Sequence, residues 1–200
     1  MSEGITVIGI DWSITSPAWT VLTNDYAPEF HFFTGPSVLK KNPPFSSPDK
    51  RHYQFHIYPG YENDQERFDL LARMLWYSIA GKPNPKVYLE GYSYAARGLV
   101  FNIAESTGVL KHLLWTKAKI VPEIVPSTHW KAFNGMKGNA EKREVVENFV
   151  ARTGINLYND FNVKPEKKNL GVLTDIADSF WIANYGWCKE DGHEYFTEAK

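Results

Sequence analysis

Short apolar runs and longer segments of helical periodicity alternate along the chain. The apolar runs have the length of strands and are bounded by turn residues; they lie at 5–10, 18–23, 31–35, 87–90 and 119–125. Helical spacing of apolar residues recurs at 63–80, 99–116, 140–152 and 173–187, and a further short helix is predicted at 127–133. This order predicts an α/β fold, in which helices cover both faces of a mixed five-stranded sheet.

Proline, glycine and polar residues mark where these elements are interrupted. Pro122 lies inside the last apolar run, which indicates a strand at the edge of the sheet. Residues 36–60 are rich in Pro, Ser and Lys and predict a loop or an insertion. Ser127 is expected to cap the short helix, and Gly154 to end the helix at 140–152. The pattern contains neither a repeat nor an interdomain linker, so we expect a single domain over residues 1–200.

The composition predicts a globular protein without disulfides or membrane spans. Hydrophobic residues make up 43% of the 200 residues, which is enough for a core without disulfides, and Cys188 is the one cysteine. The first residues lack the basic and apolar regions of a signal peptide, and no apolar run reaches the ~18 residues of a membrane span. We therefore expect a cytoplasmic protein with no membrane partner.

The net charge of −1 provides no general attraction to nucleic acid, so DNA binding would depend on a local patch. The charge is unevenly distributed, and residues 97–152 carry nine Lys and Arg against five Asp and Glu. Composition alone does not distinguish this basic block from chance.

Four carboxylates lie at the ends of predicted elements, in apolar surroundings. Asp11 follows the first strand and Glu90 ends the fourth, while Asp175 and Asp178 lie three residues apart on the last helix and share one face. Each acid alone has an ordinary structural explanation, such as a turn, a solvated strand end or the dipole of a first helical turn. If the two strands are neighbours and the helix packs beside them, the four carboxylates converge.

A convergent cluster of carboxylates would repel itself unless cations lie within it. Hard divalent ions prefer oxygen ligands, and Mg²⁺ typically takes a few carboxylates together with water and substrate phosphate. Two such ions, roughly 3.5–4 Å apart, would promote in-line displacement at phosphorus. The pattern therefore predicts a metal-dependent nuclease.

Four segments, taken in order, resemble the RuvC-like Holliday junction resolvases of the RNase H-like superfamily. GIDWSITSPAWTV has the strand, the Asp, the polar turn and the second strand, and VYLEGYSYAARGLVFNIAESTGVLKHLL has a strand that ends in Glu before a helix with small residues. VPSTHWKAFNGMKGNAEKREVV carries a Pro-Ser/Thr-x-x-Lys turn and a Gly-Asn-Ala-x-Lys helix start, and DIADSFWIANYGW carries the D-x-x-D helix. Together these segments span most of residues 5–187.

The resemblance implies an RNase H-like fold and a homodimer that resolves four-way DNA junctions by paired symmetric nicks, with two Mg²⁺ ions for which Mn²⁺ substitutes. It makes Asp11, Glu90, Asp175 and Asp178 the metal ligands. It also makes Lys142 a basic residue near the scissile phosphate, and Lys131 and Arg143 further candidates for DNA contact. Compact resolvases of this type are often encoded by phages, which would place the protein in the host cytoplasm.

The sequence departs from the family pattern in two places. Trp12 and Ser13 stand where familiar resolvases have a Gly after the first acid. Ser93 lies nearest to the position of the family's junction-wedging aromatic, and Tyr92 and Tyr94 on either side of it become candidates for stacking on a base, with core packing as the alternative.

The predicted helix at 99–116 is a candidate dimer interface, because it is apolar around much of its circumference. Its main apolar stripe consists of Leu99, Ile103, Leu110 and Leu114, and the small residues Ala104, Ser106, Thr107 and Gly108 would permit close helix packing. A core helix packed on the sheet is the alternative.

Several other classes of protein have parts of this arrangement of strands and acids. An actin-like ATPase or sugar kinase also begins with a strand and an Asp, but it needs Gly-rich turns that SITSPA does not supply. A DnaQ-like exonuclease has a second acid where this chain has Ser13. A less selective nuclease for flaps and branched DNA, and an inactive nucleic-acid-binding module on the same fold, remain open.

Overall fold

The structure of the protein is a computed structural model that describes residues 4–24, 27–34, 53–58, 60–92, 100–166, 170–193 and 195. The strands in these residues are β1 (Thr6–Asp11), β2 (Ala18–Thr23), β3 (Glu29–Thr34), β4 (Tyr53–Ile57), β5 (Pro85–Glu90) and β6 (Glu123–Val125). They form one six-stranded sheet in the order β4-β3-β2-β1-β5-β6.

The sheet is mixed, as predicted. β1, β2 and β3 form an antiparallel meander, whereas β4 pairs parallel to β3, β5 parallel to β1, and β6 parallel to β5. The parallel pairing of β1 with β5 places the carboxyl ends of both strands at the same edge of the sheet.

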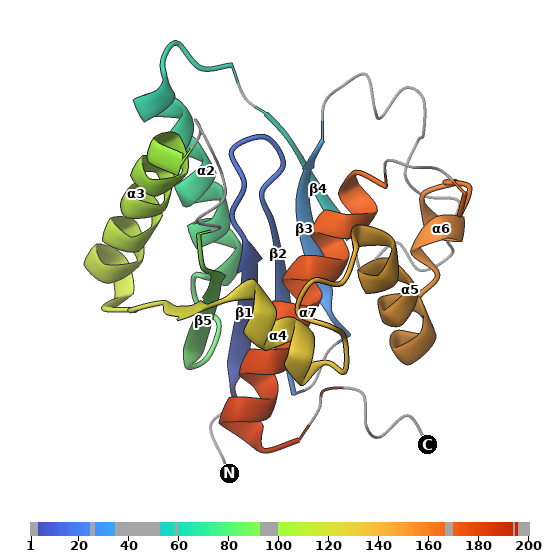
Figure 1. The fold of residues 1–200 in the computed structure, drawn as a ribbon. Coiled ribbons are helices and arrows are strands. Elements are labelled where there is room, and N and C mark those ends of the chain that lie inside the picture. Colours follow the sequence, from blue (N-terminus) through green and yellow to red (C-terminus); the bar gives the residue numbers. More distant parts are fainter. Residues whose placement is uncertain are drawn as a thin grey trace.

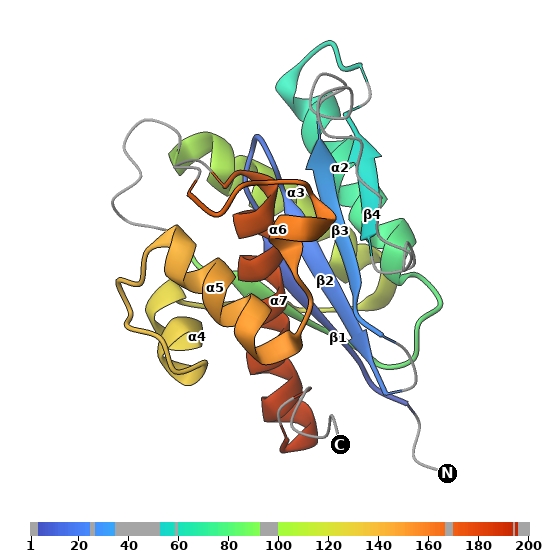
Figure 2. The same cartoon turned by 90° about the vertical axis from the view of Figure 1, so that its right-hand side faces the viewer.

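Helices cover both faces of the sheet, which confirms the predicted α/β architecture (Figures 1 and 2). One face carries α2 (Asp64–Ile79) and α3 (Val100–Ala118). The other face carries α7 (Val172–Asp191) together with α4 (Ser127–Phe133), α5 (Lys142–Thr153) and α6 (Leu157–Asp160). β1 contributes to both cores, because Val7 packs toward α7 while Ile8 and Ile10 pack with residues of α2 and α3.

Three details differ from the sequence prediction. The sheet has six strands instead of five, because Tyr53–Ile57 forms β4 inside the segment 36–60 that was predicted as a loop; residues 35–52 lie outside the described residues. Pairing in β6 begins only after Pro122, although its edge position is as predicted. Pro126 rather than Ser127 is the N-cap of α4, whereas Gly154 does end α5 with a left-handed φ of 72°.

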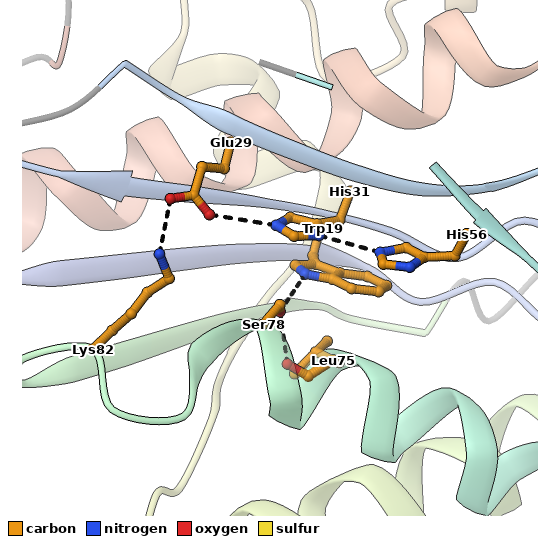
Figure 3. Close-up of polar contacts among 7 residues, drawn as sticks. All are labelled: Trp19, Glu29, His31, His56, Leu75, Ser78 and Lys82. Atoms are coloured by element: carbon orange, nitrogen blue, oxygen red, sulfur yellow. Dashed lines mark hydrogen bonds and ion pairs between the residues drawn. The ribbon is translucent and has the colours of Figure 1, made fainter. Parts of the chain in front are cut away.

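A stack of rings attaches β4 to the rest of the sheet (Figure 3). His31 of β3 and His56 of β4 each stack on Trp19 of β2 with ring centroids 5.1 Å apart, and His31 Nδ1 lies 3.2 Å from His56 Nε2. Glu29 lies on the other side of His31, at 3.6 Å, and accepts a 2.8 Å hydrogen bond from Lys82. The spacing of the histidines in the sequence predicts no role for them, because the pairing of His31 with His56 depends on the register between β3 and β4.

The helices found in the described residues are all too short or too polar to cross a membrane.

Candidate active site

Two parallel strands deliver Asp11 and Glu90 to one edge of the sheet. Ile10 of β1 pairs with Leu89 of β5, so the next residues, Asp11 and Glu90, are neighbours. Gly9 faces α7 so closely that a Cβ would overlap the helix backbone, and Tyr88 packs against the same helix. Since alternate residues of a strand share a face, both acids project on the side of the sheet that α7 covers.

The first turns of α7 contribute the other two acids. Asp175 and Asp178 lie on one helical face, between residues that are buried in the core. The pKa of Asp11 is raised well above its usual range, first by burial and then by the negative charges of Glu90, Asp178 and Asp175. The structure therefore brings all four predicted acids within electrostatic reach of one another.

The acids on α7 also resist ionisation. Burial, together with the negative charge of Glu90, raises the pKa of Asp178 to about 8. Burial raises the pKa of Asp175 to about 6, while a hydrogen bond from Ser16 opposes the increase. Acids with pKa values raised to this extent are typical of functional sites.

Glu90 has a partner that sequence reasoning did not identify. The indole N–H of Trp130, which is buried in α4, donates a 3.4 Å hydrogen bond to Glu90 Oε1. Burial raises the pKa of Glu90, and this hydrogen bond together with the charges of Lys131 and Lys142 opposes the increase. Trp130 thereby favours the ionised carboxylate and restricts its orientation.

Two of the three predicted basic residues act on the acid cluster. Lys142 is the first residue of α5 and its charge stabilises the ionised form of all four acids. Lys131 donates a 3.1 Å hydrogen bond to the carbonyl of Ala140, and its charge acts on Glu90 and Asp178. Arg143 is exposed, and its charge acts on Tyr158 instead.

The chemistry of this donor set fits a hard divalent cation. All four groups are carboxylates, and a bound cation would offset their burial and also the repulsion that contributes to the raised pKa values of Asp11 and Asp178. Within the described residues, no group of three or more His, Cys, Asp or Glu side chains is arranged to hold a metal ion by itself. A cation bound by these acids would therefore take further ligands from water and substrate phosphate, as Mg²⁺ typically does.

A pocket of about 170 Å³ opens beside the acids, between the sheet edge and the first half of α3. It is lined by Asp11, Trp12, Ser13, Glu90, Gly91, Tyr92, Val100, Ile103 and Thr107. Trp12, at the departure from the family pattern, is buried and donates a 2.9 Å hydrogen bond to Ser106 of α3. Tyr92 is 41% exposed, with Lys111 Nζ 5.8 Å from its ring centre, whereas Tyr94 lies outside the described residues.

Hydrogen bonds from two residues of other elements fix the turn between β1 and β2, and sequence reasoning did not identify either residue. Arg67 of α2 and the hydroxyl of Tyr58 both donate hydrogen bonds to the carbonyl of Ile14. The same turn carries Ser16, the hydrogen-bond partner of Asp175. No signal in the sequence pointed to this contact, because it joins residues more than forty positions apart.

The sheet order and the helices on both faces are those of an RNase H-like α/β fold. Solved structures with this arrangement include RuvC from Thermus thermophilus, with 15% sequence identity, a TM-score of 0.51, and 94% of this chain and 98% of RuvC covered. RuvC of T. thermophilus in complex with a Holliday junction substrate aligns with a TM-score of 0.52 and 16% identity, over 94% and 98% of the two chains.

The yeast mitochondrial Holliday junction resolvase Ydc2 has the same fold. It aligns with a TM-score of 0.52 and 16% identity, over 93% of this chain and 78% of Ydc2. A scan against protein-family models finds no match, and a search of curated proteins finds none either. The likeness is therefore one of fold.

Proposed function

We propose that the protein is a metal-dependent endonuclease that resolves four-way DNA junctions. The observation that supports this function is the convergence of Asp11, Glu90, Asp175 and Asp178, whose pKa values are all raised by burial, at one edge of an RNase H-like sheet. The solved structures with this fold include a RuvC bound to a Holliday junction substrate. A binding module without catalytic function would have no need to bury four acids together.

The four acids would hold two Mg²⁺ ions, or Mn²⁺ in their place. When bound, such ions activate water and stabilise the leaving 3′ oxygen during phosphodiester hydrolysis. Lys142 and Lys131 would attract the scissile phosphate and balance the charge of the cluster. The start of α5 adds backbone N–H groups, which favour an anion next to Lys142.

A homodimer would account for paired nicks, because a four-way junction has approximate two-fold symmetry. In α3, the predicted stripe is mainly a core face: Leu110 and Leu114 are fully buried, and Leu99 lies outside the described residues. The exposed face of α3 instead carries Phe101 (79% exposed), Gly108 and Trp115 (49% exposed). These positions are seven residues apart, the spacing of a helix–helix seam.

A cleavage panel tests the proposed function. Four-way junction, flap, duplex, single strand and RNA–DNA hybrid are incubated with the protein in Mg²⁺ or in EDTA, with Asp178→Asn as the inactive control. We expect symmetric nicks in the junction, in Mg²⁺ only and with the wild-type protein only. Equal cutting of flaps would indicate the less selective nuclease, whereas tight junction binding without any cutting would indicate a binding module.

A further inference from the structure

The turn between β1 and β2 carries two hydroxyl groups in sequence, and the second of them reaches one of the four acids. Ser16 donates a hydrogen bond to Asp175. The Oγ of Ser16 lies 3.4 Å from the Oγ of Ser13, and the backbone N–H of Ser16 donates a 2.9 Å hydrogen bond to that same Ser13 oxygen. A hydroxyl has one hydrogen to donate, so Ser13 is the donor in the contact between the two hydroxyls. The orientation of Asp175 therefore depends on where the turn places Ser16.

Two side chains from outside the turn fix its position. Arg67 of α2 donates to the carbonyl oxygen of Ile14, and the hydroxyl of Tyr58 donates to the same oxygen at 3.1 Å. A carbonyl oxygen has two lone pairs, so these two donors use its full capacity. Hydrogen bonds from a charged donor are about twice as strong as neutral ones, which makes the contact from Arg67 the stronger of the two.

Aromatic packing restrains both donors. The ring of Tyr58, directly after β4, packs on Phe33 of β3 with ring centroids 4.8 Å apart. The guanidinium of Arg67 lies over the rings of Tyr58 and Tyr61, at 5.5 and 5.3 Å from their centres, which is the distance of cation–π contacts. Burial raises the pKa of the Tyr58 hydroxyl, and the negative charge of Asp175 makes a smaller contribution in the same direction. Tyr58 and Asp175 are therefore within electrostatic reach of each other.

We propose that Arg67 and Tyr58 are positioning residues for the divalent-cation site: they fix the turn through the Ile14 carbonyl, and the turn orients Asp175 through Ser16. Removing an outer contact of a metal ligand typically costs about 10–100-fold in metal affinity or activity. This inference rests on the proposed function and assigns residues outside the acid cluster a role in cation binding.

Ser13 stands at one of the two departures from the family pattern, so the resemblance does not predict this arrangement.

Binding of Mn²⁺ alone to the free protein, followed by the loss of the free-ion EPR signal, tests the proposal without any need for cleavage. Ser16→Ala should weaken Mn²⁺ binding about tenfold, whereas Ser16→Thr, which keeps the hydroxyl, should stay within about twofold of wild type. Arg67→Met should weaken binding about fivefold and Tyr58→Phe about threefold, because either change loosens the turn but leaves the Ser16 hydroxyl in place.

Two residues of α2 provide matched controls. Arg73→Met is the control for Arg67→Met, because Arg73 belongs to the same helix but pairs with Asp69 at the surface. Tyr77→Phe is the control for Tyr58→Phe, at a tyrosine that is 71% exposed. Both controls should bind Mn²⁺ with wild-type affinity. Thermal unfolding shows whether each variant is folded, and Tyr58→Phe, which removes a single oxygen, keeps the proposal testable if Arg67→Met is not.

A double-mutant cycle separates positioning through the turn from an independent role of Arg67. In the Ser16→Ala background, Arg67→Met should change Mn²⁺ affinity by less than about twofold, because the link to Asp175 is already lost. Losses that add would overturn the proposal. Unchanged Mn²⁺ affinity in Arg67→Met, with a salt slope of junction binding lower by about one unit, would also overturn it and would make Arg67 a phosphate contact instead.

The results distinguish this inference from the function on which it rests. A wild-type protein that binds Mn²⁺ and cuts junctions, with Arg67→Met and Tyr58→Phe variants that bind Mn²⁺ equally well, would overturn the inference alone. A wild-type protein that binds Mn²⁺ but cuts no DNA would overturn the proposed nuclease, and the binding comparison would still decide the positioning role. A wild-type protein that binds no Mn²⁺ would overturn both.

Discussion

The four acids create an energetic conflict between function and stability. A metal ion requires them ionised, whereas burial raises the pKa of Asp178 to about 8 and that of Asp175 to about 6. In the unfolded chain an Asp ionises near pH 3.9. The metal-free fold is therefore favoured by protonation below that pH, and it loses this advantage as pH rises toward the folded pKa.

Replacement of Asp178 by Asn should abolish Mg²⁺-dependent cleavage and also stabilise the metal-free protein. At pH 8 we expect a gain of about 1–3 kcal/mol in the free energy of unfolding, because a neutral amide carries no penalty for ionisation. Thermal unfolding in EDTA at pH 5 and pH 8 measures the effect: wild type should lose more stability than the variant between the two. Equal losses, or full activity of the variant, would remove Asp178 from the cluster.

Lys142 is the basic residue whose charge acts on all four acids, which places it where a scissile phosphate would bind. Lys142→Ala should slow cleavage and lower the slope of log affinity against log salt by about one unit, the loss of one phosphate contact. Lys117→Ala, an exposed lysine at the other end of α3 from the pocket, is the control. If both variants behave alike, Lys142 is a surface residue without a role in DNA contact.

Gly9 allows the contact that positions Asp11, because any Cβ at this position would overlap α7 at Ser179 and Ala183. Gly9→Ala should lower stability by about 1–3 kcal/mol through overpacking and should reduce cleavage, since β1 and α7 would separate. Gly60→Ala is the matched control, since it meets no atom within 4 Å. Denaturant unfolding compares the two, and a Gly9→Ala variant as stable as Gly60→Ala would disprove this close contact.

The strands and helices were predictable where the periodicity was strong. The apolar run before Asp11 and the D-x-x-D helix identified the two elements that bear acids, and their order predicted the convergence. β4 was not predicted, because the alternation in Tyr53–Ile57 is short and adjoins a segment rich in Pro and Lys. Contacts such as Trp130 with Glu90, or Arg67 with Ile14, depend on packing between elements that local sequence patterns do not encode.

The edge strand β4 depends on a histidine pair that acid should disrupt. Burial, together with a smaller effect of the neighbouring His31, lowers the pKa of His56 to about 4. Burial also lowers the pKa of His31, while Glu29 opposes that change and Lys82 adds to it. A histidine with a depressed pKa stabilises the fold above its unfolded value of about 6.5, and this stabilisation is lost as pH falls toward 4.

His56→Phe should remove part of this acid sensitivity, because a phenyl ring can still stack on Trp19 but cannot gain a proton. Between pH 7 and pH 4 we expect wild type to lose about 1 kcal/mol more than the variant, after allowance for solvent screening. Thermal unfolding across this pH range, with hydrogen exchange of the β4 amides, provides the measurement. His129→Phe, at an exposed histidine of α4, is the control and should retain the wild-type pH dependence.

Assembly of the whole molecule is proposed to depend on the exposed face of α3. Trp115→Arg places a charge in this face and should shift the protein from twice its chain mass of 22.9 kDa to the mass of one chain in sedimentation. Tyr77→Arg, at a 71% exposed aromatic of α2, should leave the dimer intact. A wild-type protein that remains one chain while bound to a junction, and yet makes paired nicks, would contradict the dimer.

The packing of α7 on the sheet has a consequence for the newly made chain. The contact between Thr20 and Ser179, at 2.9 Å, joins positions 159 residues apart, so most of the polypeptide is synthesised before its last helix can dock. Synthesis proceeds at about 5–20 residues per second, so several seconds pass on the ribosome between synthesis of the strands and synthesis of α7. Asp11 and Glu90 lack Asp175 and Asp178 throughout that time, so the proposed nuclease stays inactive until translation of α7 is complete.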